Sequence, residues 1–115
     1  MVSTMVDNSS SVNYSGHMLE VYKTEEFAQW FKRLRDLKAR ARIQARIDRL
    51  EQGHFGDAQS VGDGVSELRL FHGPGYRIYF TRRSLVIVIL LTGGDKSSQA
   101  KDIAKAKRLA QQLET

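Results

Sequence analysis

The chain has 115 residues, no cysteine and a formal net charge of +5, which comes from 18 lysines and arginines against 13 aspartates and glutamates. This length allows a single domain with one core, and the lack of cysteine excludes disulfides and thiolate zinc sites. The longest apolar run, residues 85–91, is far shorter than the roughly 20 residues that cross a bilayer, and no signal peptide is evident, so we expect a cytoplasmic protein without a membrane segment.

Residues 1–17 differ in composition from the rest of the chain. They are rich in serine and asparagine and show no hydrophobic period, which predicts a disordered N-terminal extension. Apolar and polar side chains then alternate loosely over residues 18–23, as expected for a first strand. We therefore place one domain over residues 18–115.

Two amphipathic helices are expected after this strand. Thr24 can cap the first helix, residues 36–38 are expected to form a tight connection, and Gly53 is suited to end the second helix. The two helices should form a hairpin that packs on the sheet. Apolar residues recur at helical spacing in both segments: Phe27, Trp30, Phe31, Leu34, Ile43, Ile47 and Leu50.

The region of these helices is strongly basic. Residues 31–50 hold eight basic residues against two acidic ones. Arg42, Arg46 and Arg49 fall at i, i+4 and i+7 and are expected to share a helix face away from the apolar side. Such a stripe can bind nucleic acid or an acidic protein partner, or it can be a solvated helix face, and charge alone does not decide between them.

The second half of the chain predicts a sheet. Four glycines and two aspartates make residues 53–64 a predicted loop. Strands are expected over residues 65–71 and 76–81, joined by a Gly-Pro-Gly turn. After a further turn at residues 82–84, residues 85–91 are apolar on both faces and predict a central strand.

A Gly-Gly-Asp-Lys corner at residues 93–96 leads into a last helix, which we expect over residues 98–113. The order strand, helix, helix, three strands, helix predicts an α+β fold in which an antiparallel three-strand meander follows the helical hairpin. The apolar side of the last helix is expected to contain Ile103, Ala106, Leu109, Ala110 and Leu113.

Three cations are the first candidates for chemistry. Arg69 and Arg77 lie on hairpin-linked strands, each opposite the aliphatic residues of its strand, where we expect exposure. Paired guanidiniums can clamp a phosphate, although they can also simply solvate the open face of a sheet. Lys96 follows a buried strand and precedes a helix, which is a common place to hold an anion. Alternatively, the two glycines make a turn, Asp95 caps the helix and Lys96 is solvated.

Acid–base candidates are few. His72 lies in the predicted turn near Arg69 and can serve as an acid or a base, although a surface histidine without a role is the simpler reading. Tyr76 and Tyr79 can stack on bases or donate hydrogen bonds, although Tyr76 alternates with core residues. The sequence shows no paired carboxylates, no nucleophile motif and no set of metal ligands, so we expect no metal and no small-molecule cofactor.

The stretch that contains ELR, GPGYRIYFTRR, the apolar strand and GGDKSSQAKDIAKAK resembles the RelE/ParE superfamily of toxins, and most closely its phage Gp49-like, HigB-like group of addiction module killer proteins. The EFAQWFKRLRD helix extends this resemblance over residues 18–115. It implies a RelE-like fold and the toxin of a type II toxin–antitoxin pair, neutralised by a cognate helix-turn-helix antitoxin. RelE- and HigB-like members cleave mRNA on the ribosome without a metal, whereas ParE-like members poison DNA gyrase.

The resemblance also implies roles for individual residues. Arg69 of ELR, Arg77 of GYR and Lys96 would orient the scissile phosphate and stabilise the transition state in which the 2′-hydroxyl attacks. RelE-like enzymes carry a catalytic tyrosine in the C-terminal segment that this chain lacks, so Tyr79 is the candidate substitute and His72 a further acid–base candidate. The resemblance predicts a ribosome-dependent, metal-independent mRNA endoribonuclease, with a ParE-like gyrase inhibitor as the alternative. The expected nucleic-acid contacts are Arg42, Arg46, Arg49, Arg82 and Arg83.

Overall fold

The computed structural model describes residues 5–8 and 18–113. Within these residues, no helix is long and apolar enough to cross a bilayer. The elements follow one another in the order β1 (Met5–Asn8), β2 (Glu20–Thr24), α1 (Glu25–Arg33), α2 (Leu37–Glu51), β3 (Ala58–Gly62), β4 (Val65–Arg69), β5 (Arg77–Arg82), β6 (Ile87–Gly94), the 3₁₀ helix η1 (Lys96–Ser98) and α3 (Gln99–Gln112).

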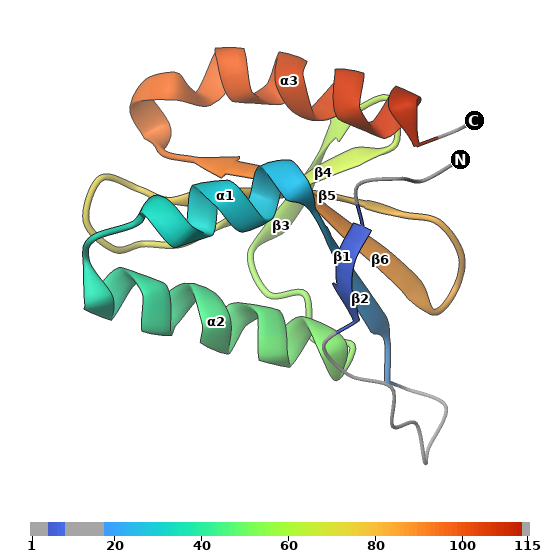
Figure 1. The fold of residues 1–115 in the computed structure, drawn as a ribbon, viewed down its shortest axis with the longest axis horizontal. Coiled ribbons are helices and arrows are strands. Elements are labelled where there is room, and N and C mark those ends of the chain that lie inside the picture. The colour runs from blue at the N-terminus through green and yellow to red at the C-terminus, as the bar shows by residue number, and fades with distance from the viewer. Residues whose placement is uncertain (1–4, 9–17, 114–115) are drawn as a thin grey trace.

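All strands of the described residues belong to one sheet, in the order β1-β2-β6-β5-β4-β3 (Figure 1). The strands β4, β5 and β6 form the predicted antiparallel meander, and β2 runs parallel to β6 on its other side. The strand β6 is therefore central, which explains why it is apolar on both faces. The predicted α+β architecture, with an N-terminal strand, a helical hairpin, the meander and a C-terminal helix, is confirmed.

The helices cover both faces of the sheet. The hairpin of α1 and α2 packs on one face, and α3 lies on the other (Figure 1). Two separate apolar clusters result. The cluster under α1 and α2 consists of Leu19, Val21, Phe27, Ile43, Ile47, Leu50, Leu68, Leu70, Ile78, Phe80, Val88 and Leu90. The smaller cluster under α3 consists of Val65, Tyr79, Ile89, Leu91, Ala106, Ala110 and Leu113.

Side-chain caps set the start of both hairpin helices. The Thr24 hydroxyl accepts a hydrogen bond from the Phe27 N–H at 3.0 Å, as predicted, and donates one to the Leu91 carbonyl of β6 at 2.7 Å. The Asp36 carboxylate accepts hydrogen bonds from the N–H groups of Lys38 and Ala39 at 3.0 and 3.2 Å. The prediction of a connection over residues 36–38 is therefore wrong, because Asp36 is an N-cap and α2 already begins at the next residue.

The sheet is wider than predicted at both edges. Residues 53–64 contain β3, which pairs antiparallel with β4, in place of the predicted loop. Its sequence, AQSVG, has little intrinsic strand preference, so pairing with β4 and not local pattern forms it. Four residues of the expected extension over residues 1–17 form β1, against β2, so the prediction of disorder does not hold for them. The rest of that extension lies outside the described residues.

The central strand is shifted relative to the prediction. The strand β6 begins at Ile87, and Leu85 lies in the preceding turn with 87% of its surface exposed. Its end includes Gly93 and Gly94, which were expected to form the corner. A Cβ atom on Gly93 would lie 2.4 Å from the Trp30 ring, and one on Gly94 would overlap the Asp102 carboxylate. These glycines thus allow α1 and α3 to approach the sheet closely.

Candidate functional site

Three neighbouring strands bring the predicted cations together at one end of the sheet. Arg69 of β4 is the direct cross-strand partner of Arg77 of β5, which in turn faces Gly94 of β6. Lys96 follows two residues later in η1, and its N–H donates to the Pro74 carbonyl of the β4–β5 hairpin at 3.3 Å. Antiparallel pairing therefore gathers Arg69, Arg77 and Lys96, which we call the cation cluster, beside the hairpin.

The three cations differ in how they are held. Lys96 is exposed, and Asp95 caps its 3₁₀ helix by accepting from the Ser97 N–H at 2.9 Å. Arg69 is 35% exposed and forms an ion pair with Asp57 at 3.0 Å. Arg77 is only 12% exposed, so the expected exposure of this residue is wrong. The cluster thus ranges from a sheltered guanidinium to a free ammonium group.

The reason for the burial of Arg77 is Glu67. The prediction placed Arg77 on an open face, but α3 covers that face, and Glu67, on the same face, has no exposed surface. Its Oε2 lies 3.4 Å from Arg77 Nε and accepts hydrogen bonds from the Tyr79 hydroxyl at 3.1 Å and from Gln99 Nε2 at 2.9 Å. A fully buried carboxylate needs such partners, because an unpaired charge in the interior is very costly.

The guanidinium of Arg77 is fixed from two sides. In addition to Glu67, its Nη1 donates to the Gly75 carbonyl in the hairpin at 2.9 Å. Among the described residues, Glu67 Oε1 and Arg77 Nε are buried and have no hydrogen-bond partner, so Glu67 holds Arg77 by an ion pair and not by a hydrogen bond. The arrangement leaves Arg77 with a fixed direction, which is the condition for preorganised binding of an anion.

Tyr79 is not available to a substrate in this structure. Its ring is fully buried in the cluster under α3, and its hydroxyl is engaged with Glu67. Burial raises the pKa of Tyr79 well above its ordinary value, and the nearby Glu67 carboxylate raises this pKa further. The phenol therefore stays protonated near neutrality and serves as a hydrogen-bond donor to Glu67.

His72 points away from the cation cluster. Its Nε2 lies 3.4 Å from Asp36 Oδ2 at the start of α2. The pKa of Asp36 is lowered, first by the hydrogen bond from the Ala39 N–H and further by the neighbouring His72 imidazole. His72 also lines a cavity of about 220 Å³ with Arg42, Arg49 and other residues of α2. The structure thus associates His72 with α2 and not with Arg77.

The predicted arginine stripe on α2 has one structural member. Arg46 donates from Nη1 to the Arg69 carbonyl at 2.7 Å and from Nη2 to the Phe55 carbonyl at 3.2 Å, so it joins α2 to β4. Partial burial, followed by the charge of Arg49, lowers the pKa of Arg46. Arg42 and Arg49 are exposed on the helix surface. The expected shared face therefore holds two free cations and one that is committed to the fold.

Arg82 and Arg83 lie at the other end of the sheet. Arg77 begins β5 and Arg82 ends it. Arg82 lies over the Phe55 ring at 5.1 Å and donates to the Leu85 carbonyl, and Arg83 donates to the Leu113 carbonyl at the end of α3. The structure does not bring these two arginines to the cation cluster.

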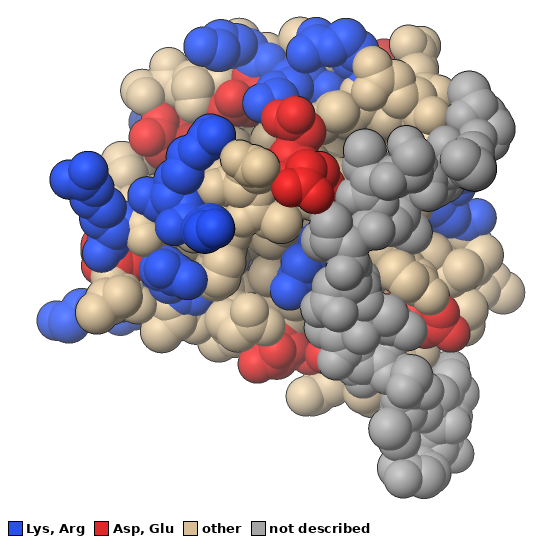
Figure 2. Space-filling view, viewed as in Figure 1, with Lys and Arg blue, Asp and Glu red and all other residues tan. Residues whose placement is uncertain are grey.

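Cationic side chains gather at the end of the molecule that holds the α1–α2 corner and the β4–β5 hairpin. Figure 2 shows them where the α1–α2 corner and the β4–β5 hairpin lie in Figure 1, with further lysines and arginines along α3. The exposed cations of the α1–α2 corner are Lys32, Arg33, Arg35 and Lys38. A polyanion that approaches this end meets a surface of mainly one sign.

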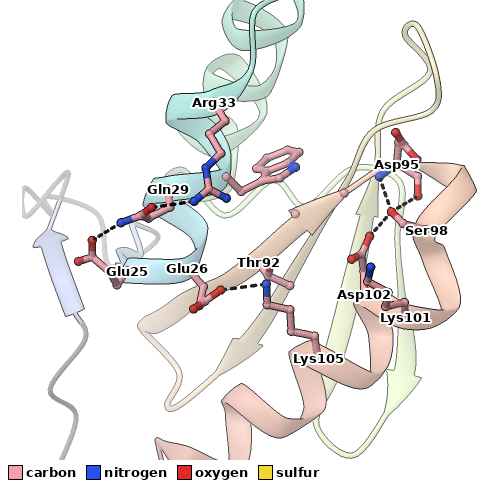
Figure 3. A pocket seen from close by; sticks show the side chains of 13 residues that line it. Glu25, Glu26, Gln29, Arg33, Thr92, Asp95, Ser98, Lys101, Asp102 and Lys105 are labelled. Carbon is pink, nitrogen blue, oxygen red and sulfur yellow. Dashed lines mark hydrogen bonds and ion pairs between the residues drawn. The ribbon is translucent and has the colours of Figure 1, made fainter.

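A polar cleft of about 500 Å³ lies between α1, the end of β6 and α3 (Figure 3). Its walls carry both signs, and the Lys105 ammonium bridges across to Glu26 at 2.9 Å. Ser98 joins Asp95 to the buried Asp102 on the α3 side. Because none of the three cations of the cluster lines it and its charges are mixed, this cleft does not suit a phosphate backbone.

The family model "Phage derived protein Gp49-like (DUF891)" matches residues 29–114. The chain belongs to the Gp49-like family. This family is part of the RelE and addiction module killer group, so the recognition made from the sequence is confirmed. Membership of the family indicates a toxin of a toxin–antitoxin pair, with an antitoxin as its partner.

The Gp49-like chain is also similar to a Haemophilus influenzae protein described as "Uncharacterized protein". The two are 52% identical over 95 residues, which cover 83% of this chain and 96% of the relative. No solved structure matches this chain at a significant level. The relative thus matches most of this chain, and its description states no activity.

Glu67 and Gln99 are members of the candidate site that sequence reasoning missed in this Gp49-like chain. A signal was present, because the predicted apolar side of the last helix needed a sheet face to cover. That face carries Glu67, Arg77 and Tyr79, so their burial follows once α3 is placed there. Among the described residues, no group of three or more His, Asp or Glu side chains could hold a metal ion.

Proposed function

We propose that this Gp49-like toxin is a ribosome-dependent endoribonuclease that cleaves mRNA without a metal, with the cation cluster as its phosphate-binding centre. The observation that carries the proposal is the convergence of Arg69, Arg77 and Lys96 from β4, β5 and η1 beside the hairpin. Three cations at one sheet end suit the charge of a phosphodiester, which grows on the non-bridging oxygens as the 2′-oxygen attacks.

The chemistry that such a centre supports is a transfer within the RNA strand. The 2′-oxygen forms a bond to phosphorus as the bond to the 5′-oxygen breaks, which leaves a cyclic phosphate and a 5′-hydroxyl. The 2′-hydroxyl loses its proton to a base, and the departing oxygen gains one. Cations that hold the phosphate supply orientation and charge stabilisation, which are large contributions to rate.

Glu67 is the positioning residue of this centre. It holds Arg77 Nε at 3.4 Å while Tyr79 and Gln99 fix the carboxylate itself. This role was expected neither for Glu67 nor for Tyr79, which was a candidate for direct proton transfer. Tyr79 is buried and His72 faces α2, so the position of neither acid–base candidate supports the proposal. The proposal rests on charge stabilisation by the cation cluster.

The exposed cations outside the cluster serve affinity in this account. Arg42 and Arg49 are free to contact RNA phosphates or the acidic arm of an antitoxin. Arg82 and Arg83, at the opposite end of the sheet, are bound to backbone carbonyls and are weaker candidates for such contacts.

Induced expression without an antitoxin tests the proposal. Incorporation of labelled amino acids should fall before DNA synthesis does, because the proposed target is translation. If DNA synthesis stops first while mRNA stays intact, the toxin acts as a ParE-like gyrase inhibitor and the nuclease proposal is wrong. A variant in which Leu85, exposed in the turn at the other end of the sheet, is replaced by alanine should arrest translation like the parent chain.

A further inference from the structure

Phe71 is the only phenylalanine among the described residues whose side chain is exposed. It follows β4 in the hairpin, and 86% of its surface is open to solvent. Leaving such a ring in water forgoes a favourable burial of roughly 1.5–3 kcal/mol, and a single aromatic side chain gains nothing for the fold in that position. The residues around Phe71 therefore indicate which kind of ligand could cover the ring.

Those surroundings are cationic. Phe71 and His72 line a cavity of about 220 Å³ together with Arg42 and Arg49 of α2. This volume lies below the roughly 300–1,000 Å³ of typical small-molecule sites, so the cavity suits one flat group at most. Arg46 forms part of the wall but is committed to two backbone carbonyls, which leaves Arg42 and Arg49 for a ligand.

The two free arginines are spaced for two anionic groups. Arg42 and Arg49 are seven residues apart, which corresponds to about 10 Å along a helix. Both side chains line the same cavity, so successive phosphates of one strand can contact the two guanidiniums. A flat ring between two separated cations matches the alternation of base and phosphate in single-stranded RNA, where bases stack on aromatic side chains.

We propose that the cavity between α2 and the β4–β5 hairpin binds one unpaired RNA nucleotide, whose base stacks on Phe71 while Arg42 and Arg49 hold flanking phosphates. This inference rests on the proposed function, because it supplies a second anchor for the same RNA. The site lies on the α2 side of the β4–β5 hairpin, whereas Arg77 lies on the α3 side, where it pairs with Glu67 beside Gln99 of α3. The RNA would therefore cross this hairpin between them. His72, whose Nε2 lies 3.4 Å from Asp36 Oδ2, forms part of the cavity wall.

Fluorescence anisotropy with a labelled single-stranded oligouridine, at several salt concentrations, tests the inference. Phe71→Ala should weaken binding about 5- to 150-fold, the range that loss of one stacked base produces, and should leave the salt dependence unchanged. Arg49→Ala should lower the slope of log K against log salt by about 0.7, because one phosphate contact is lost. Phe71→Trp should bind as well as the parent chain.

Leu85→Ala is the matched control, since Leu85 is as exposed as Phe71 but lies at the other end of the sheet. The inference is overturned if the parent chain does not bind the oligonucleotide, or if Phe71→Ala binds it as tightly as the parent. It is also overturned if Phe71→Ala loses only antitoxin in a pull-down, since the ring would then contact protein. If Phe71 governs oligonucleotide binding but induced cells keep intact mRNA, the nuclease proposal fails and the nucleotide site stands.

Discussion

The two faces of the sheet are built from different chemistry. The face under α1 and α2 buries aliphatic and aromatic side chains from both helices and from β2, β4, β5 and β6. The face under α3 buries a smaller apolar cluster beside a set of polar groups, among them Glu67, Thr92 and Asp102. The first face stabilises the fold. The second face buries, in place of a further apolar side chain, a carboxylate that orients Arg77.

This difference separates the residues that stabilise the fold from those that position the groups of the candidate site. A core of aliphatic groups is stabilised by burial in proportion to area, so any residue there matters through packing. A buried carboxylate with one guanidinium partner is a poor source of stability, since desolvation offsets the attraction. Its presence under α3 is best explained by the direction that it gives to Arg77.

The largest effect is expected for Arg77→Ala. Removal of one donor to a developing charge typically lowers the rate by about 10²–10³, so toxicity should be lost. The same change leaves the Glu67 carboxylate buried without its cation, which should cost about 3–5 kcal/mol of unfolding free energy. Adding Glu67→Gln removes that penalty, because the amide is neutral and of similar size.

The double variant therefore separates stability from activity. Chemical denaturation should show that Glu67→Gln recovers most of the stability lost in Arg77→Ala, and growth assays should show no return of toxicity. A toxic, well-folded double variant would contradict the role of Arg77. A double variant as unstable as the single one would contradict the electrostatic pairing with Glu67.

A change on the face under α1 and α2 should lower stability and leave activity unchanged. Ile47→Ala removes a fully buried side chain of α2 and should cost about 2–5 kcal/mol of unfolding free energy. Activity per folded molecule should stay unchanged, because Ile47 lies in the apolar core away from the cation cluster. Urea denaturation, together with mRNA cleavage at a temperature where the variant is folded, measures both quantities. A selective loss of activity without loss of stability would break the distinction between the faces.

The arginines of α2 should divide into two classes. Arg46→Ala removes two charged hydrogen bonds to the Phe55 and Arg69 carbonyls and should lower the unfolding free energy by about 1.5–3 kcal/mol. Arg42→Glu and Arg49→Glu should leave stability nearly unchanged but weaken ribosome binding in a salt-dependent way. Co-sedimentation at several salt concentrations, beside an antitoxin pull-down, checks this. If only neutralisation by the antitoxin suffers, the face serves the protein partner.

Tyr79→Phe should have the smallest effect. Loss of the hydrogen bond to Glu67 should cost about 1–2 kcal/mol, and toxicity should persist. Because the folded-state pKa of Tyr79 is raised, its contribution is complete below about pH 10 and is lost as the pH rises through that folded-state pKa. Between pH 8 and 11, the denaturation midpoint should thus fall less steeply with pH for the variant than for the parent chain. The difference is the pH dependence that one tyrosine contributes to the unfolding free energy. A loss of activity of about 100-fold or more would instead make Tyr79 an acid–base catalyst.

The elements that could be predicted are those with a local signal. Helical spacing gave α1, α2 and α3, and the apolar run gave the central strand β6, although the structure begins this strand at Ile87. The Gly-Pro-Gly turn fixed the pairing that sets Arg69 against Arg77. Meander topology alone was therefore enough to bring the cation cluster together.

The features that could not be predicted depend on tertiary contacts. The edge strand β3 has a polar sequence and forms through pairing with β4. Glu67 has the parity of an exposed residue and becomes buried only because α3 covers it. Arg46 looks like its neighbours in the stripe, and only the position of Phe55 and β4 makes it structural. Periodicity predicts which residues lie on the same face of a helix or strand, but not which element packs against that face.

Mapping of mRNA 5′ ends after induction tests the central claim most directly. Cells that express the parent chain should accumulate new 5′ ends within translated reading frames, and cells that express the Glu67→Gln/Arg77→Ala variant at equal level should not. Inhibition of translation initiation should abolish the new ends, because the proposed cleavage requires a translating ribosome. Intact mRNA in growth-arrested cells that carry the parent chain would contradict the account.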